Sequence, residues 1–229
     1  METASPLTTR QLKAKETRAR LFAAAAELFD AQGYHQTSVD QIAKRAQVAK
    51  GTFFLHFATK DAVIGELVRI QHRGARRARE RVLQEGGSPL DALRALVMGL
   101  GQMAAMSRPL SRAVLSATLE SPTLGGEAAA LFKAVFDEMV VDCKNAQAEH
   151  MLDRTPDAET IAQVLMASYL GAALHFTSSP GAKGLLEILT PIVNANLAAF
   201  QKTIEKRASR PVAARSSAEK KSTRRRVAS

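Results

Sequence analysis

The chain has 229 residues with 5% aromatic residues, no Trp and one Cys, and its formal net charge is +10 at pH 7. No apolar run reaches the roughly eighteen residues of a membrane-spanning helix, and this excludes an integral membrane protein. The single cysteine excludes an internal disulfide and no apolar signal segment stands at the N-terminus, so we expect a cytoplasmic protein.

The positive charge is concentrated at the two ends of the chain. Residues 1–81 carry 15 Lys and Arg against 8 Asp and Glu, and residues 205–229 carry 9 against 2. Residues 82–204 carry 8 against 12. A basic N-terminal region on a mildly acidic body indicates that a polyanion such as DNA contacts the N-terminal region alone.

The N-terminal segment, residues 1–12, is polar and is expected to form a flexible arm. A helix with an apolar stripe is predicted for residues 13–32. Arg10, Lys13 and Lys15 have two open interpretations, because they either follow DNA phosphates or are simply solvated.

Residues 37–57 predict a short helix, a tight turn and a second short helix. Ser38 and Gln41 have the spacing of a capping box at the start of the first helix. Phe53 and Phe57 are four residues apart and are expected to point inward from the second. Helices shorter than about a dozen residues are marginal alone, so this pair must pack on its neighbours. Its outward polar face either fits into the DNA major groove or is the solvated face of a surface hairpin.

Residues 14–66 resemble the DNA-binding domain of the TetR (tetracycline repressor) family. The resemblance is carried, in order and without a gap, by Gly33-Tyr34, by T-S-V-D-Q-I-A at 37–43, by V-A-K-G-T-F-F-L-H-F at 48–57 and by Lys60-Asp61-Ala62. The chain departs from the family pattern at Gln47, Ala49 and Phe54, where the family usually has Gly, Ser or Thr, and Tyr. The resemblance implies a helix-turn-helix DNA-binding domain over residues 13–66.

The outward positions of this domain are the predicted DNA contacts. Lys50 and Thr52 are expected to reach base edges, with Gly51 allowing close approach. Phe54 is expected to touch a thymine methyl group or a sugar. The predicted contacts to the sugar–phosphate backbone are Thr37, Ser38, His56 and Lys60.

Residues 67–207 predict a larger helical bundle, so the fold class is all-α. Gly and Pro breaks separate helices expected at about 59–85, 89–107, 110–120, 127–152, 155–177 and 183–207. The last two are apolar enough to be buried either within one subunit or against a second copy. In the resembling family the matching pair forms a four-helix dimer interface, which implies a homodimer.

The two remaining features are a candidate ligand pocket and a basic tail. Residues 208–229 are rich in Ser, Ala, Arg and Lys, so a disordered tail is expected that either adds non-specific DNA affinity or has no role. Helix bundles hold apolar pockets between their helices. The candidate lining residues are Gln102, Met103, Met106, Phe132, Phe136, Met139, Met166, Tyr169 and Phe176.

These features together predict a sequence-specific transcriptional regulator. The resemblance implies a repressor that binds a palindromic double-stranded DNA operator as a homodimer and is released by a small lipophilic ligand, with no metal or cofactor. A ligand-independent or architectural DNA-binding protein is the alternative. An enzyme is disfavoured, because the chain lacks a G-x-S-x-G motif, a Gly-rich phosphate loop and an H-E-x-x-H motif.

Overall fold

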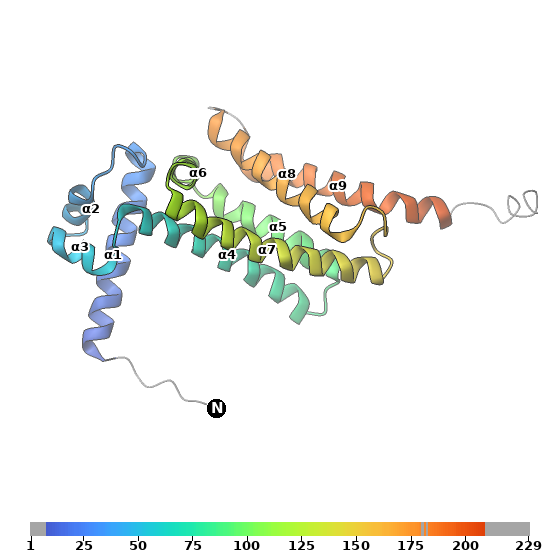
Figure 1. Ribbon diagram of the computed structural model, residues 1–229, viewed down its shortest axis with the longest axis horizontal. Coiled ribbons are helices and arrows are strands. Elements are labelled where there is room, and N and C mark those ends of the chain that lie inside the picture. The colour runs from blue at the N-terminus through green and yellow to red at the C-terminus, as the bar shows by residue number, and fades with distance from the viewer. Residues whose placement is uncertain (1–7, 180, 182, 209–229) are drawn as a thin grey trace, which may run out of the picture.

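The computed structural model describes residues 8–179, 181 and 183–208, of which residues 122–125 and 202–208 are described by their backbone alone. Within these ranges helices are the only regular elements (Figure 1). They are α1 (Thr9–Gln32), α2 (Val39–Arg45), α3 (Lys50–His56), α4 (Lys60–Gln84), α5 (Pro89–Ala105), α6 (Arg108–Glu120), α7 (Pro122–Ala148), α8 (Ala158–Ser178) and α9 (Leu185–Ala208). The predicted all-α fold is confirmed. None of the helices in these ranges combines the length and the apolar character needed to cross a bilayer.

The first helix begins earlier than the sequence predicted. Thr8 accepts a hydrogen bond from the backbone N–H of Gln11, whose side chain accepts one from the backbone N–H of Thr8, and this capping box starts α1 at Thr9. The expected flexible arm therefore does not extend to residue 12. The rest of that predicted arm, residues 1–7, and the predicted basic tail from residue 209 onward lie outside the described residues.

The start of α7 also differs from the prediction. The sequence predicts a break across Ser121 to Gly126, but α7 begins at Pro122 and includes both Gly125 and Gly126. Proline at a first helical position lacks an N–H that would in any case have no partner, so it starts a helix without cost. Pro109 is likewise compatible with the first turn of α6.

The molecule is elongated, with α1, α2 and α3 at one end and α8 and α9 side by side along one edge (Figure 1). It contains two apolar cores. The core of the N-terminal end is built around Leu21, Phe29 and Phe53, and it extends to Ala113 and Ala117 of α6. Residues on both sides of the predicted domain boundary at residue 66 therefore pack into one core. Phe132 of α7 packs against both cores.

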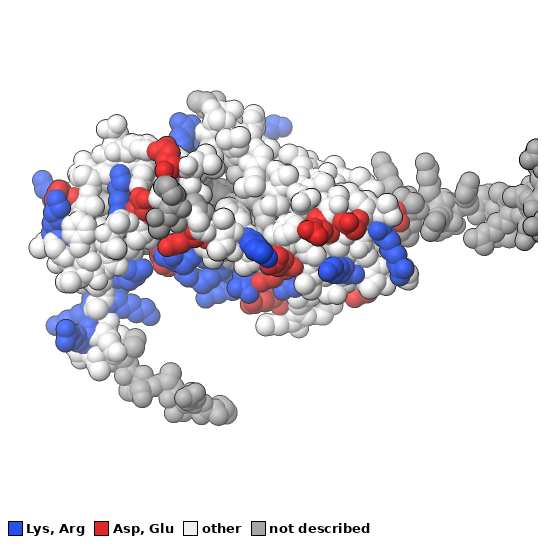
Figure 2. Space-filling model, in the orientation of Figure 1, with Lys and Arg blue, Asp and Glu red and all other residues white. Residues whose placement is uncertain are grey.

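Helix α4 runs along both parts and packs closely on α5. A Cβ atom on Gly99 of α5 would lie 2.7 Å from the Ala75 Cα atom of α4, so glycine permits this approach. Three arginines of α4 pair with acids of α7. Side-chain N and O atoms are 3.1 Å apart in Arg69–Glu127, 2.6 Å in Arg76–Glu138 and 2.6 Å in Arg79–Asp142. Lys/Arg and Asp/Glu side chains accordingly alternate along this side of the molecule (Figure 2).

Candidate nucleic-acid interface and ligand cavity

The α2–turn–α3 unit begins with the predicted capping box. The Ser38 hydroxyl accepts the Gln41 backbone N–H at 3.2 Å, and the Gln41 side chain accepts the Ser38 backbone N–H at 2.7 Å. In the turn, Gln47 adopts φ 55°, a left-handed conformation that costs a non-glycine residue about 1–2 kcal/mol. Helix α3 then starts after Ala49, whose side chain makes no capping hydrogen bond. The start of the motif is therefore stabilised by its capping box, whereas the turn and the start of α3 depend on packing.

Packing of two phenylalanines holds α3 in place. Phe53 and Phe57 are 0% and 2% exposed, as their spacing predicted, and their ring centroids are 5.7 Å apart. The Arg18 guanidinium of α1 lies 4.1 Å from the Phe57 ring centroid, and it also donates to the backbone carbonyl of His56. The inner face of α3 is therefore fixed to α1, and its outer face is left for a partner.

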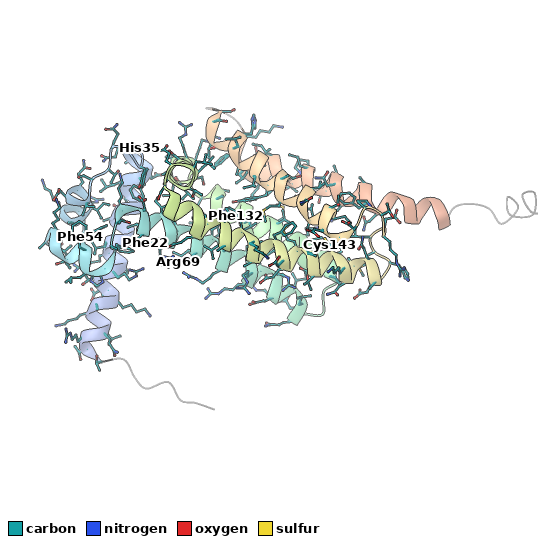
Figure 3. The ribbon with its side chains drawn as sticks, in the orientation of Figure 1. Phe22, His35, Phe54, Arg69, Phe132 and Cys143 are labelled. Atoms are coloured by element: carbon teal, nitrogen blue, oxygen red, sulfur yellow. The ribbon has the colours of Figure 1, made fainter. Side chains whose placement is uncertain are left out.

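The outer face of α3 carries polar and apolar side chains together. Lys50 and Gly51 are exposed, and Thr52 and His56 are half-buried. Phe54 is 49% exposed at the outer end of the molecule (Figure 3), and Leu55 is 83% exposed. Leu55 was not among the predicted contacts, although its place between two outward positions could have indicated it. Ser38, at the start of α2, is exposed as well.

Lys50 is paired with an acid of the same motif. Its Nζ lies 2.8 Å from Asp40 Oδ2, and both side chains are more than half exposed. Exposed ion pairs contribute only about 0–1 kcal/mol, so Lys50 can exchange Asp40 for a base edge or a phosphate at little cost.

Two predicted DNA contacts have structural roles instead. Thr37 is 2% exposed, and its hydroxyl donates to the Gly33 carbonyl at 2.8 Å. The Lys60 ammonium donates to the carbonyls of Tyr34 and Thr37 at 2.8 and 3.0 Å, and it lies 3.9 Å from the Tyr34 ring centroid. Burial lowers the pKa of Lys60. Both side chains fix the loop between α1 and α2, so we remove them from the predicted phosphate contacts.

The loop between α1 and α2 also contacts the regulatory part through α6. His35 Nε2 lies 3.1 Å from the Ser116 hydroxyl and 3.4 Å from Glu120 Oε2. The Ser107 hydroxyl at the start of α6 donates to Asp30 near the end of α1. Movement of α6 would therefore be transmitted directly to the base of the α2–α3 motif.

A cavity of about 450 Å³ lies between the two parts of the molecule. Its wall is formed by α1, α4, α5, α6, α7 and α8, and Figure 3 marks Phe22 and Phe132, which come from the first and fifth of these helices. No side chain on the described wall is charged. The wall residues are Phe22, Ala26, Leu67, Val68, Ile70, Gln71, Met103, Ala104, Met106, Ser107, Leu110, Ser111, Val114, Leu115, Thr118, Leu119, Phe132, Tyr169, Leu170, Ala173 and Thr177.

Cys143 and His150 lie in different surroundings. Cys143 is fully buried in the C-terminal core, and burial, reinforced by the charge of Asp142, raises the pKa of its thiol to about 12. His150 is exposed in the turn after α7. Across the described ranges, no three His, Cys, Asp or Glu side chains are grouped as metal ligands.

Comparison with known proteins places these features in a family. A family model described as "Bacterial regulatory proteins, tetR family" matches residues 21–67, which span the end of α1, the α2–α3 motif and the start of α4. The transcriptional regulator TcmR of Streptomyces glaucescens is 52% identical over 54 residues, or 24% of each chain. At residues 21–67 the chain is therefore similar to the TetR family of bacterial regulatory proteins.

The curated relatives are similar over only part of the chain. The A-factor receptor protein of Streptomyces griseus is 32% identical over 119 residues, which cover 51% of this chain and 40% of that protein. A Bacillus subtilis regulator, YdgC, is 37% identical over 75 residues, covering 33% of this chain and 38% of its own. The chain thus spans between 24% and 57% of the length of the curated relatives it matches.

Solved TetR-family structures extend the similarity to about four fifths of the chain. Thermus thermophilus FadR, described as a TetR-family transcriptional repressor in complex with lauroyl-CoA, is 28% identical, with a TM-score of 0.60 over 79% of this chain and 93% of its own. The fatty acid degradation regulator FadR from Bacillus halodurans is 20% identical, with a TM-score of 0.68 over 79% and 94%. The second likeness concerns the fold alone.

The predicted cavity residues divide into two groups. Met103, Met106, Phe132 and Tyr169 lie on the cavity wall. The others lie elsewhere: Gln102 is exposed, Met139 is fully buried in the C-terminal core, Phe136 and Met166 pack against that core, and Phe176 lies beneath the Arg108 guanidinium.

The sequence interpretation missed the contributions of α1, α4 and most of α6 to the cavity. The sequence does not distinguish Phe22, Gln71 and Thr118 from the other residues of their helices, which were assigned to other roles. No periodic pattern within one helix reports which of its apolar residues face an unfilled space, because that depends on the neighbouring helices.

Proposed function

We propose that the chain is a homodimeric, sequence-specific DNA-binding repressor of the cytoplasm, bound to the nucleoid through its operator and released by a small lipophilic effector. The observation that carries the proposal is the anchored helix α3, whose buried Phe53 and Phe57 hold Lys50, Gly51 and Thr52 toward the outside. The B-DNA major groove is about 12 Å wide and admits one such helix.

Uncompensated charge near this motif supports the choice of DNA as the partner. In the N-terminal half of α1, Arg10, Lys13, Lys15 and Arg20 are exposed, with no ion pair among the described residues. Four of the arginines of α4, by contrast, pair with Glu66 or with acids of α7. Lys and Arg side chains gather on the part of α1 that projects past the α2–α3 motif (Figure 2).

An exposed apolar face on α8 and α9 supports the homodimer. Leu170, Leu174 and Ile192 are 44%, 56% and 37% exposed. Small residues beside them, including Gly171 and Ala195, allow the helices of a second copy to approach closely. A two-fold dimer would present two copies of α3 to successive turns of one duplex, which matches a palindromic operator.

The cavity supports control by an effector. Its wall joins α1 of the DNA-binding part to α4, α6 and α8, so an occupant would contact both parts. Thermus thermophilus FadR, which is similar over most of its length, is described as bound to lauroyl-CoA. An effector releases the operator only if it binds the DNA-incompetent arrangement more tightly.

Footprinting on the DNA upstream of the chain's own gene tests the proposal. We expect one short palindromic protected segment and binding at least about 1,000 times tighter than to random DNA. Lys50→Ala should weaken operator binding by about 1–3 kcal/mol and relax the choice of base at one position. Lys144→Ala, an exposed lysine on α7, serves as the control and should bind as the parent does.

Two outcomes would reject this function. Diffuse protection, with random DNA bound as tightly as the upstream segment, would favour an architectural role. A strictly monomeric protein would remove the basis for a palindromic operator.

A further inference from the structure

The hydroxyl groups on the cavity wall differ in what they already bind. Three are committed within the protein: Ser107 donates to Asp30, Ser111 to the Ala104 carbonyl, and Thr177 to the Leu174 carbonyl. The remaining two belong to Thr118 of α6 and Tyr169 of α8. These two are therefore the ones to examine for ligand binding.

The Thr118 hydroxyl has no partner. Its oxygen is buried and makes no hydrogen bond within the described chain. A buried polar group left in this state costs about 1–3 kcal/mol, and a partner inside the cavity would recover that cost.

The Tyr169 hydroxyl is left with a free proton. Gln71 Nε2 donates to the Leu100 carbonyl at 3.0 Å and also to the Tyr169 hydroxyl oxygen. The Leu100 carbonyl can only accept, so the atom facing it must be the amide nitrogen, and the Tyr169 oxygen must accept from it. The proton of Tyr169 then has no acceptor among the described groups. Tyr169 is 4% exposed, and burial raises its pKa to about 12, so it remains a neutral donor.

The rest of the wall excludes charged ligands. No Lys, Arg, His, Asp or Glu lies on its described surface. An ionised carboxylate or ammonium buried there would find no opposite charge, and an unpaired buried charge costs several kcal/mol. A volume near 450 Å³ falls within the range of about 300–1,000 Å³ that is usual for drug-sized ligands.

We propose that the cavity binds an uncharged, mainly apolar molecule that carries a carbonyl-type acceptor, and that the Thr118 and Tyr169 hydroxyls donate to this acceptor. An ester, ketone or lactone with a long chain or ring system has this chemistry, whereas a free fatty acid or an amine does not. The role of this molecule as the releasing effector rests on the proposed function, but its binding to the cavity does not.

Calorimetric titration of the full chain at pH 8 tests the ligand class. The probes are methyl dodecanoate, dodecanoate and dodecylamine, which share a twelve-carbon chain and are neutral, anionic and cationic. We expect the ester to bind and each ion to bind at least about 100-fold more weakly, because each would bury an unpaired charge. Binding of either ion as tightly as the ester, or no binding of the ester, would overturn the proposal.

Conservative variants test the two donors. Thr118→Val and Tyr169→Phe should each weaken ester binding about 2- to 10-fold, as expected for the loss of one neutral hydrogen bond. Ser178→Ala removes a hydroxyl that lies off the cavity wall and is already committed to the Leu174 carbonyl, and it should leave ester affinity unchanged. A double variant Thr118→Val/Tyr169→Phe with undiminished ester affinity would contradict the assignment.

Operator binding measured without any probe separates this inference from the proposed function. A chain that binds the ester selectively but no palindrome would keep the ligand assignment and reject the regulator. A chain that binds its palindrome but prefers dodecanoate would keep the regulator and reject the ligand assignment.

Discussion

Ala49 occupies the N-cap of α3 with extended angles, φ −68° and ψ 149°, that are suited to a capping residue. Its methyl group cannot accept a hydrogen bond from the first turn. We predict that Ala49→Ser raises the free energy of unfolding by about 1 kcal/mol, because the new hydroxyl satisfies one unpaired backbone N–H. Urea denaturation measures this change. Ser38→Ala at the start of α2 should lower stability by a similar amount, and a destabilising Ala49→Ser would show that the space is already filled.

His72 makes the fold sensitive to acid. The ring is 2% exposed, lies edge-on to Phe132 at 4.9 Å between centroids, and has no hydrogen bond of ordinary geometry at either nitrogen. Burial lowers its pKa from 6.5 to about 4; the Leu131 backbone opposes this shift, and the Arg76 charge adds to it. Below pH 6.5 the unfolded chain therefore binds a proton that the folded chain does not, and stability falls as the pH falls toward 4.

The corresponding prediction compares the parent with His72→Leu. At pH 5 the parent should have lost about 2 kcal/mol through this residue relative to pH 8, and His72→Leu should not show that part of the loss. Denaturation midpoints at pH 8, 6.5 and 5 give the comparison. Identical pH profiles for the two proteins would mean that His72 becomes protonated in place.

At the scale of helices, the sequence predicted the elements whose signals are local. The capping box at Ser38 and the pair Phe53–Phe57 lie within a few residues of one another, and both are present as expected. The early start of α1 at Thr9 also had a local signal, the Thr8–Gln11 box, which was overlooked. The cavity could not be derived in this way, because Phe22, Gln71 and Thr118 meet only when α1, α4 and α6 pack together.

The pair Arg79–Asp142 joins α4 to α7 across the middle of the bundle. Arg79 Nε and a second guanidinium nitrogen donate to the two Asp142 oxygens at 2.6 and 2.7 Å, and the side chains are 15% and 1% exposed. We predict that Asp142→Leu destabilises the fold by about 3–5 kcal/mol, because it leaves the Arg79 charge buried and unpaired. Thermal and urea denaturation measure the loss.

Two matched variants control this prediction. Arg79→Met/Asp142→Leu should recover most of the stability, since it removes both charges. Asp137→Leu breaks the exposed Lys133–Asp137 pair, whose side chains are 73% and 57% exposed, and should cost less than about 1 kcal/mol. Equal losses at Asp137 and Asp142 would show that burial does not decide the strength of these pairs.

The N-terminal half of α1 should contribute to DNA affinity through charge alone. Replacing Arg10, Lys13 and Lys15 by Gln should reduce the slope of log K against log salt by about 0.9 for each DNA phosphate that is no longer neutralised, without changing the preferred sequence. Lys133, Lys144 and Arg154 are also exposed but belong to α7 and the turn after it, and their triple Gln variant is the control. Equal slopes for the two triple variants would mean that these α1 side chains are only solvated.

At the scale of the whole molecule, the two apolar cores are joined rather than separate. Phe132 packs against both, α6 contributes Ala113 and Ala117 to the N-terminal core, and the cavity lies between the two parts. A ligand that fills this space changes the packing of both cores at once. The exposed face on α8 and α9 would then carry any change of orientation to a second copy.

This face gives the prediction that concerns the assembly. Leu170 and Leu174 are among the most exposed large apolar side chains of α8. We predict that Leu170→Glu/Leu174→Glu yields a monomer in analytical ultracentrifugation, because four like charges would face one another across a two-fold axis. The monomer should bind a full palindrome at least about 100-fold more weakly than the dimer, since it engages one half-site at a time. Its affinity for an isolated half-site should match that of the parent, which excludes damage to α3.

Leu83→Glu, which alters an exposed leucine of α4 instead, should remain dimeric. A double variant that stays dimeric would place the interface on another surface.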